Sequence, residues 1–261
     1  MSAPVLIFDS GVGGLSVARS LALRHPDIAQ CYACDNAWLP YGLRDDVTLS
    51  ERILAVCRAA VAACGAGALV IACNTASTLA LDRLRATLSI PVIGTVPAIK
   101  PAALASRTRH IGLLATTATV NRPYTQDLIE RFASDCRVSR VAADPLVVQA
   151  EAWLAGEEID RDRVSRALAP LWQATALSPA LDTVVLGCTH FPLLKPVLEA
   201  LSPVPLGWVD SGDAIARRVA DVASHCVGRR DGRCFTTAAA DHLAAGFAEF
   251  GFTHPRRLAL P

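Results

Sequence analysis

Lysine is scarce in this chain, and neither sign of charge is in excess. Lys100 and Lys195 are the only lysines among 25 basic residues, so chemistry that needs a Schiff-base lysine, including that of pyridoxal phosphate, would have to use one of these two. With 24 acidic residues the formal net charge is +1, which provides no general attraction to nucleic acid or to a membrane surface. We therefore expect no direct nucleic-acid partner.

Long apolar segments are lacking as well. The longest, residues 59–73, is interrupted by Gly65 and Gly67 and is too short and too broken to span a bilayer. The first residues lead directly into the apolar run 5–8 and carry no basic segment of the kind that begins a signal peptide. The sequence therefore predicts a cytoplasmic protein with no membrane partner.

Cysteine, in contrast, is abundant, but its pattern indicates neither disulfides nor a metal. The chain has nine cysteines, an odd number, and no secretion signal, which favours reduced thiols. Cys31 and Cys34 form a single CxxC motif, and a zinc site of that kind needs a second pair at matching spacing. We expect these two thiols to be buried on opposite faces of a strand, and we predict no metal site.

Short apolar segments alternate with amphipathic ones along the chain, which is typical of an α/β fold. An apolar fraction of 52% is enough for a well-filled core. The charged segment 229–233 is expected to be a surface loop. We expect strands at residues 5–8, 31–34, 68–73, 91–95, 111–115, 137–142 and 183–187, and helices at residues 13–22, 49–64, 75–88, 121–132 and 164–176.

The two halves of the chain show a weak repeat of this pattern. Residues 7–11 resemble residues 113–117, and residues 68–73 match residues 183–188 more closely, because each is an aliphatic run that leads into a polar loop. Ligands of open α/β sheets bind beyond the carboxyl ends of the strands, so the halves are expected to enclose one site. We predict a first domain of residues 1–97 plus 209–261 and a second domain of residues 98–208.

Cys73 and Cys188 are the strongest candidates for chemistry. Each follows an expected strand and precedes an expected helix, where unpaired amides and the helix dipole favour a thiolate. A buried structural cysteine is the simpler interpretation of either one alone. Two thiols in the same local setting, one in each half, instead indicate that a proton is removed from one face of a carbon and returned to the other.

A glycine-rich turn, residues 9–14, ends the first strand. Its glycines allow close backbone approach, and the amides of the following helix start suit an anion. The turn lacks the third glycine of a dinucleotide fingerprint and the lysine of a Walker loop. The alternative is a tight strand-to-helix turn in which Asp9 serves as a cap.

Three further places in the sequence could serve the site, and each also has a simpler structural interpretation. His190 could exchange a proton with Cys188, so a Cys–His hydrolase stays possible. However, residues two apart at a strand end do not usually face one another, and no third orienting residue is evident. Tyr41 and Gly42 follow Pro40 in a loop, where a turn without function is the alternative. Glu151 precedes Trp153 in an amphipathic stretch and is interpreted as a first-turn helix carboxylate.

Taken together, these motifs resemble the cofactor-independent aspartate/glutamate racemase superfamily, and within it the glutamate racemases. The combination of the opening turn with both cysteine motifs is far more specific than any single motif. The resemblance extends over the whole chain, in residues 8–15, 40–42, 73–77, 116, 118–120, 187–194, 209–212 and 235–237.

The resemblance implies two pseudo-symmetric flavodoxin-like α/β domains with parallel sheets and an active site in the cleft between them. It implies L- and D-glutamate as the substrates, with Cys73 acting on D-glutamate and Cys188 on L-glutamate, no metal and no organic cofactor. The D-glutamate would supply peptidoglycan synthesis, and the chain would form a homodimer or a monomer–dimer equilibrium. Further catalytic roles are implied for Asp9, His190 and Glu151, and substrate contacts for Asp9, Ser10, Tyr41, Gly42, Asn74, Thr75, Thr116, Thr119, Thr189 and His190.

Two positions depart from the family pattern. Ala115 stands where the family commonly has glycine, and we expect its methyl group to tighten the wall of the pocket. Glu151 is one residue short of the place where the family has a glutamate. Three other functions stay open: an isomerase acting on aspartate or another acid, a superfamily decarboxylase, which would use one cysteine, and a binding or regulatory protein such as the family members that bind DNA gyrase.

Overall fold

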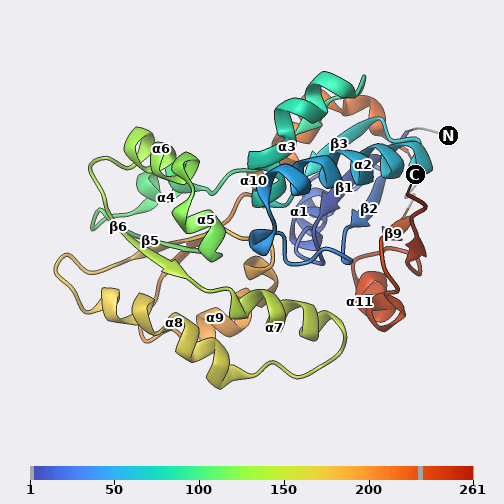
Figure 1. Ribbon diagram of the computed structural model, residues 1–261. Helices are drawn as coiled ribbons and strands as arrows, with labels where there is room; N and C mark the ends of the chain where they lie inside the picture. Colours follow the sequence, from blue (N-terminus) through green and yellow to red (C-terminus); the bar gives the residue numbers. More distant parts are fainter. Residues whose placement is uncertain (1–2, 229–231, 261) are drawn as a thin grey trace.

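The polypeptide forms two separate parallel β-sheets, which lie in two lobes (Figure 1). The computed structural model describes residues 3–228 and 232–260. The first sheet has the strand order β10-β9-β2-β1-β3-β4, and the second has the order β6-β5-β7-β8. The strands are β1 (Val5–Asp9), β2 (Gln30–Cys34), β3 (Ala68–Ile71), β4 (Val92–Ile93), β5 (His110–Ala115), β6 (Arg137–Ala142), β7 (Thr183–Leu186), β8 (Gly207–Val209), β9 (Cys234–Thr236) and β10 (Arg256–Arg257).

Helices connect the strands, because a chain that pairs in parallel must cross back to the same end of the sheet. The α-helices are α1 (Leu15–Arg24), α2 (Asp46–Cys64), α3 (Asn74–Thr87), α4 (Ile99–Ala105), α5 (Thr117–Asn121), α6 (Pro123–Phe132), α7 (Pro145–Leu154), α8 (Arg161–Thr175), α9 (Lys195–Leu201), α10 (Gly212–Val222) and α11 (Ala244–Glu249). Short 3-10 helices are η1 (Tyr41–Leu43), η2 (Phe191–Leu194), η3 (Ser224–Cys226) and η4 (Asp241–Leu243).

Both faces of each sheet are covered by helices. Along β1, Val5 and Ile7 point into one core and Leu6 and Phe8 into the other, because successive side chains of a strand alternate between faces. Helices α1 and α10 cover the first face, and α2 and α3 cover the second. In the second sheet, α4 and α6 lie on one face and α7, α8 and α9 on the other.

The two sheets repeat the same topology. The order β2-β1-β3-β4 of the first sheet matches the order β6-β5-β7-β8 of the second, so β3 and β7 occupy equivalent places. This equivalence confirms the repeat expected from the sequence. Strands β9 and β10, which the sequence did not predict, extend only the first sheet.

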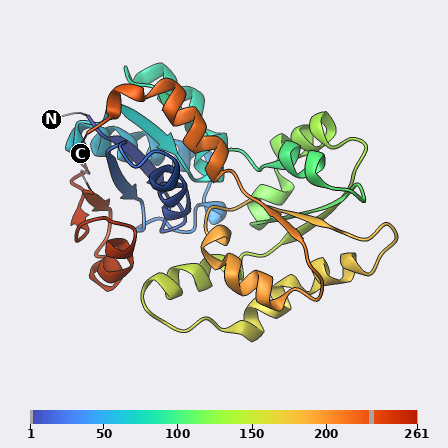
Figure 2. The same cartoon turned by 180° about the vertical axis from the view of Figure 1, so that it is seen from behind.

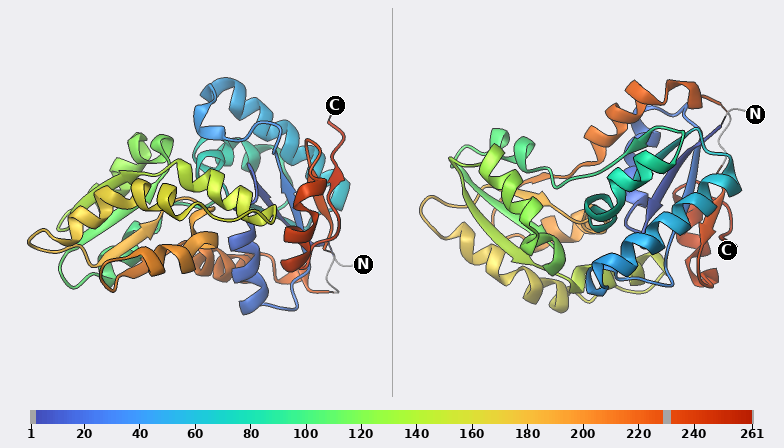
Figure 3. Two further views of the ribbon diagram at one scale, coloured as in Figure 1. Left: turned by 90° about the horizontal axis from the view of Figure 1, so that it is seen from below. Right: turned by 45° about the horizontal axis from the view of Figure 1, so that its top comes forward.

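Two connections join the lobes (Figure 2). One leads from β4 of the first sheet to α4, which packs on β7 of the second, and the other leads from β8 to α10, which packs on α1. Helix α7 of the second lobe reaches back to α11 beside the first sheet, as two further views show (Figure 3). The domain limits at residues 97 and 209 stay a proposal; the first falls within the connection from β4 to α4, whereas the second falls inside β8.

The structure differs from the expected helices at two places. The helix expected at residues 121–132 is divided in two, because Arg122 has an extended backbone (φ −70°, ψ 137°), as favoured before the ring of Pro123. The expectation that Glu151 lies in a first helical turn was wrong. Helix α7 begins at Pro145, a residue suited to the first helical position, so Glu151 lies in its last turn.

The cysteines outside the two motifs fit the expectation for reduced thiols. Cys31 and Cys34 are buried in different cores, as predicted, and no disulfide joins the cysteines of the described residues. Within residues 3–228 and 232–260, no group of three or more His, Cys, Asp or Glu side chains is arranged to hold a metal ion. Residues 229–231 of the expected surface loop lie outside the described residues.

None of the helices in the described part of the chain is both long enough and apolar enough to cross a membrane.

Candidate active site

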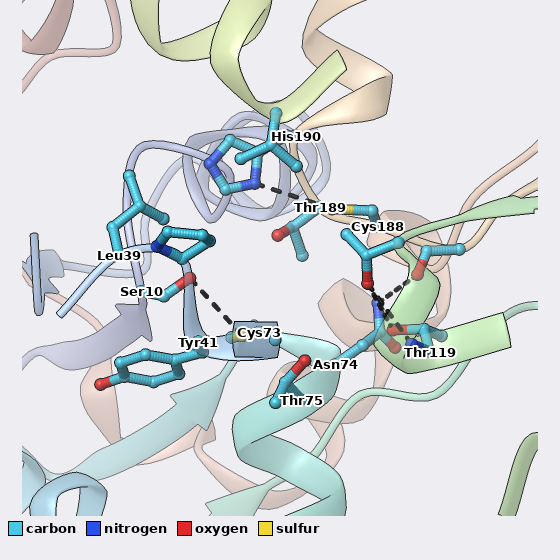
Figure 4. Close-up of a pocket in the computed structure, with 15 residues that line it drawn as sticks. Ser10, Leu39, Tyr41, Cys73, Asn74, Thr75, Thr119, Cys188, Thr189 and His190 are labelled. Atoms are coloured by element: carbon cyan, nitrogen blue, oxygen red, sulfur yellow. Dashed lines mark hydrogen bonds between the residues drawn. The ribbon is translucent and has the colours of Figure 1, made fainter. Parts of the chain in front are cut away.

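Cys73 and Cys188 line the same cavity, between the carboxyl ends of the two sheets (Figure 4). Cys73 follows β3 and is the N-cap of α3, whereas Cys188 follows β7, the equivalent strand of the second sheet. The cavity is narrow, with a volume of about 40 Å³, and it opens to solvent. Its lining residues are Ser10, Leu39, Pro40, Tyr41, Gly42, Cys73, Asn74, Thr75, Thr116, Thr119, Val147, Gly187, Cys188, Thr189 and His190.

The Cys73 thiol is linked to Asp9 through Ser10. The thiol Sγ donates to Ser10 Oγ at 3.7 Å, and Ser10 Oγ in turn donates to Asp9 Oδ1 at 3.3 Å. Burial and the nearby Asp9 charge raise the pKa of Cys73 to about 12, against the lowering effect of the Ala76 amide and Ser10. At neutral pH, Cys73 is therefore a protonated thiol.

Cys188, His190 and Glu151 form a continuous series of polar contacts. Cys188 Sγ lies 3.7 Å from His190 Nδ1, and His190 Nε2 lies 2.7 Å from Glu151 Oε1. The expectation that residues 188 and 190 do not face each other was wrong, because β7 ends at Leu186 and His190 has helical backbone angles (φ −69°, ψ −33°). Glu151 is the orienting residue that the sequence did not reveal.

The surroundings of His190 favour its charged form. Burial alone lowers the pKa of this imidazole, but hydrogen bonds and charge interactions with Cys188 and Glu151 together raise it well above its ordinary value. A protonated imidazole beside a sulfur favours a thiolate at that sulfur. The two thiols therefore lie in different settings: one beside a cation and one in a buried, hydroxyl-lined position.

The glycine-rich turn binds a carboxylate of the protein itself. The Val12 amide donates to Glu151 Oε1 at 2.8 Å, so the predicted anion at this turn is Glu151. A Cβ at Gly11 would lie 2.0 Å from Glu151 Oε1, and one at Gly13 would lie 2.5 Å from His190 Nδ1. Glycine is required at both positions because the second lobe packs directly on the turn.

Asp9 is fully buried at the junction of the lobes. Its Oδ1 accepts the Gly11 amide at 3.0 Å, and its Oδ2 accepts the Thr189 hydroxyl at 2.9 Å. Burial raises the pKa of Asp9, although the His190 charge and the hydrogen bonds from Gly11 and Thr189 partly oppose the shift. Asp9 serves as more than the simple cap of the alternative interpretation, since it joins the surroundings of the two thiols.

The hydroxyl of Tyr41 points away from the cavity (Figure 4). It donates to Asp35 Oδ2 at 2.9 Å, so Tyr41 contributes its ring and backbone to the cavity wall and not its hydroxyl. Across the cavity, Thr116 caps α5, and its hydroxyl donates to Thr119 Oγ1 at 3.1 Å. Gly42 lies close to α5, since a Cβ there would be 3.1 Å from that of Ala118.

Asn74 joins the lobes and has one free acceptor. Its Nδ2 donates to the Gly187 carbonyl at 3.0 Å, whereas its buried Oδ1 has no hydrogen-bond partner. No lysine or arginine is among the described residues that line the cavity. Lys195 pairs with Glu199, and Lys100 lies over Phe132, so neither lysine is placed for Schiff-base chemistry in this cavity.

The expected effect of Ala115 on the pocket wall was wrong. Ala115 is fully buried in the core of the second lobe and is not among the residues that line the cavity. It lies next to Gly187, where an added Cβ would be 3.1 Å from the Ala115 Cβ. Two apolar residues that line the cavity were not singled out from the sequence: Leu39, in the loop before Tyr41, and Val147, on α7 with Glu151.

Comparison with known proteins identifies the family. A profile of the Asp/Glu/Hydantoin racemase family matches residues 16–219. The chain belongs to this family. The glutamate racemase of Shewanella loihica is 44% identical over 256 residues, which are 97% of this chain and 94% of the relative. The resemblance inferred from the sequence motifs is thereby confirmed.

Solved racemase structures have the same fold. The crystal structure of Escherichia coli glutamate racemase in complex with L-glutamate and the activator UDP-MurNAc-Ala matches with a TM-score of 0.92 at 40% identity, over 99% of each chain. Glutamate racemase from Aquifex pyrophilus matches with a TM-score of 0.74 at 31% identity, over 98% of each chain. The predicted α/β fold with two parallel sheets is confirmed.

Proposed function

We propose that this chain interconverts L-glutamate and D-glutamate by cofactor-independent proton transfer at the α-carbon. One observation carries the proposal: Cys73 and Cys188 line one cavity from equivalent strand ends of the two sheets. Relatives that are 41–48% identical over 84–97% of this chain are glutamate racemases, which supports glutamate as the substrate.

In the L-to-D direction, the Cys188 thiolate removes the α-proton, and the electron pair stays on the carbon. The Cys73 thiol then donates its proton to the opposite face of that carbon. Cys73 ends as a thiolate and Cys188 as a thiol, so the D-to-L direction starts from this second state. Thiols suit both roles because their pKa values allow them to give and take protons near neutral pH.

The different surroundings of the thiols support this starting state. The His190 imidazolium, held by Glu151, places a positive charge beside Cys188, whereas burial raises the pKa of Cys73 to about 12 and keeps it protonated. The ammonium group of a bound amino acid would lower the pKa of Cys73 by placing a positive charge beside it. Asp9 acts on Cys73 through Ser10, and Thr189 fixes the orientation of Asp9.

Neutral groups bind the charged substrate in this proposal. Asn74 Oδ1, a buried acceptor without a partner, accepts a hydrogen bond from the substrate ammonium group. The two carboxylates are bound by amides at the start of α3, with its favourable dipole, and by the hydroxyls of Thr75 and Thr119. Ser10, Thr116 and Thr189 line the substrate site with hydroxyls that donate to Asp9 and Thr119. The amide of Gly42 adds a donor from the opposite loop, whereas Tyr41 shapes the wall.

The biological role follows from the product. D-glutamate supplies peptidoglycan synthesis in bacteria that have this family of enzymes. Nine cysteines without a disulfide among the described residues support a reducing compartment such as the cytoplasm. Assembly as a homodimer, or as a monomer–dimer equilibrium, stays a prediction, which sedimentation of the purified protein at several concentrations would measure.

Circular dichroism of L-glutamate with purified protein, a reducing agent and a metal chelator tests the proposal directly. We expect the signal of L-glutamate to decay to zero and that of D-glutamate to decay at a matched rate, while L-aspartate keeps its signal. Decay with aspartate alone would change the substrate. A flat signal with both acids would overturn the racemase proposal.

The series Cys188–His190–Glu151 also favours a second candidate, a Cys–His hydrolase, because it places a nucleophile, a base and an orienting carboxylate in order. Such an enzyme would use Cys188 and have no chemical need for Cys73. Release of a chromophore from glutamate γ-anilide separates the two. Hydrolysis that survives Cys73→Ser, without racemisation by the unmodified chain, would favour the hydrolase.

A further inference from the structure

Asp35 is a fully buried carboxylate just beyond β2, outside the cavity but one step from its wall. Arg52 of α2 binds it with both arms of the guanidinium, through Nε at 2.9 Å and a terminal nitrogen at 2.7 Å. The Tyr41 hydroxyl donates at 2.9 Å and the Thr237 hydroxyl at 2.6 Å. A buried charge is tolerated only when it is paired and hydrogen-bonded, so Arg52 is the cation that permits Asp35 to accept the other donors.

Arg52 is itself held firmly in place. It lies on α2, which Asp45 caps by accepting the Thr48 amide at 3.0 Å. Its guanidinium lies 5.3 Å from the centre of the Trp38 ring, within the range of a cation–π contact. The planar fork of arginine matches a carboxylate in a way that the single ammonium of lysine does not. Arg52 therefore fixes both Asp35 and the first part of the loop that follows it.

This loop forms one wall of the cavity. Residues 36–42 lead from Asp35 to η1, and four of them line the cavity: Leu39, Pro40, Tyr41 and Gly42. The Asp35 carboxylate holds the end of the loop by accepting the Tyr41 hydroxyl. Thr237 holds the beginning of the loop: its amide donates to Asn36 Oδ1 at 3.0 Å, and its Oγ1 accepts the Ala37 amide at 3.1 Å. The wall is thus held from its outer side.

The hydrogen bonds of the two thiols are made outside this loop. Cys73 and Cys188 follow other strands, and their sulfur atoms contact Ser10 and His190, respectively. Loosening the loop should therefore weaken substrate binding without disturbing proton transfer. We propose that Arg52 is a positioning residue for the substrate, which acts through Asp35 and Tyr41 on the cavity wall. The proposal rests on the proposed racemase function of this cavity.

The test compares Arg52→Met with Arg83→Met. The control residue, in α3, also donates to two neighbours, Ser50 and Glu51 of α2, but it is half exposed and lies outside the cavity lining. We expect Arg52→Met to raise KM for glutamate about tenfold with kcat within about threefold of the parent, and Arg83→Met to change neither. An unchanged KM, or a loss confined to kcat, would overturn the proposal.

Two further measurements keep the test decisive if Arg52→Met folds poorly. Arg52→Lys retains the charge without the fork, and Thr237→Val removes one donor to Asp35, so both should give KM values between those of the parent and Arg52→Met. Hydrogen exchange should quicken at residues 36–44 in each variant and stay unchanged at residues 73–77. Equal quickening in both segments would show a general loss of stability and contradict a positioning role.

The failure of the two proposals can be told apart. A parent protein that does not racemise glutamate refutes the proposed function, whatever the variants do. A parent that racemises glutamate, combined with an Arg52→Lys and a Thr237→Val protein of unchanged KM, refutes the positioning role alone. Calorimetric binding of D-glutamate measures the same loss without turnover and should weaken about tenfold in Arg52→Met.

Discussion

Glu151 and His190 are 39 positions apart in the sequence, yet Glu151 Oε1 lies 2.7 Å from His190 Nε2. The same carboxylate oxygen accepts the Val12 amide of the first lobe. Glu151 therefore does two things at once: it orients and charges His190, and it ties α7 to the glycine-rich turn. The carboxylate that favours the charged form of His190 is therefore also a contact between the two lobes.

The substitution Glu151→Gln should reduce kcat/KM about 10²-fold, because it removes the carboxylate that favours the imidazolium. The loss should be equal for both enantiomers, since they have the same free energy in solution. In the parent, the pKa of His190 is raised above its ordinary value, so the imidazolium persists until pH rises through that higher value. Without the Glu151 charge the pKa falls, and the alkaline limb of the kcat/KM profile should move to lower pH.

Glu158→Gln is the matched control, because Glu158 is exposed and lies just beyond the same helix. It should leave the rate and the pH profile unchanged. A Glu151→Gln enzyme with the alkaline limb of the parent would show that Glu151 does not set the charge of His190.

Replacement of either thiol tests the two-base mechanism. Cys73→Ser and Cys188→Ser should each reduce kcat/KM by at least about 10³-fold, because a serine hydroxyl is too weak an acid to replace a thiol in proton transfer. Cys136→Ser is the control, since Cys136 is a half-buried free thiol outside the cavity lining. Full activity in either of the first two variants would exclude the mechanism.

Gly13→Ala should disrupt the site without unfolding the chain. The added Cβ would lie 2.5 Å from both His190 Nδ1 and Thr189 Oγ1, so the histidine must move away from Cys188. A displacement of about 1 Å in a reacting group costs roughly 10²-fold in rate. Racemisation and thermal unfolding of the same preparation would measure the two effects separately.

For comparison with Gly13→Ala, Gly207→Ala places its Cβ no closer than 3.4 Å to any neighbour, an ordinary contact. That variant should retain full activity. A Gly13→Ala enzyme as active as Gly207→Ala would mean that the lobes need not pack as closely as the structure has them.

The sequence was sufficient to place the thiols, because their setting is local. An aliphatic run followed by Cys-Asn-Thr or Cys-Thr-His predicts a strand that ends at a helix start, and β3 and β7 end two residues before Cys73 and Cys188. The alternation that separates Cys31 from Cys34 is equally local. Because parallel strands place their carboxyl ends at the same edge, the local pattern also brought the four polar loops to one site.

Contacts between segments far apart in the sequence could not be predicted in the same way. The pairing of Glu151 with His190 and Val12 depends on where α7 begins and on how the second lobe sits on the first. Asp35 and Thr237 meet because β9, unpredicted, pairs with β2 at the edge of the first sheet. The hydroxyl of Tyr41, expected to contact the substrate, instead donates to the Asp35 carboxylate that Thr237 also binds.

Asp46 and Arg122 form an ion pair between the lobes, with nitrogen–oxygen distances of 3.1 and 2.9 Å. Asp46 begins α2, four residues after Gly42, and Arg122 directly follows α5. Thr116, the N-cap of α5, and Thr119, within it, line the same cavity as Gly42. The hydrogen bond from Arg122 lowers the pKa of Asp46, so the pair is charged at neutral pH. The contact closes the seam between η1 and α5 beside the cavity.

Asp46→Asn should raise KM for glutamate about threefold at low salt, an effect of the size expected for a partly exposed ion pair. Added salt screens such pairs, so KM of the parent should rise toward that of the variant, whose own KM should stay constant. The double exchange Asp46→Arg with Arg122→Asp should restore the KM of the parent. The control is Asp213→Asn, which breaks the exposed ion pair with Arg24 and should leave KM unchanged. If the exchanged pair binds glutamate no better than Asp46→Asn, the seam is held by the packing of Gly42 against Ala118 and not by charge.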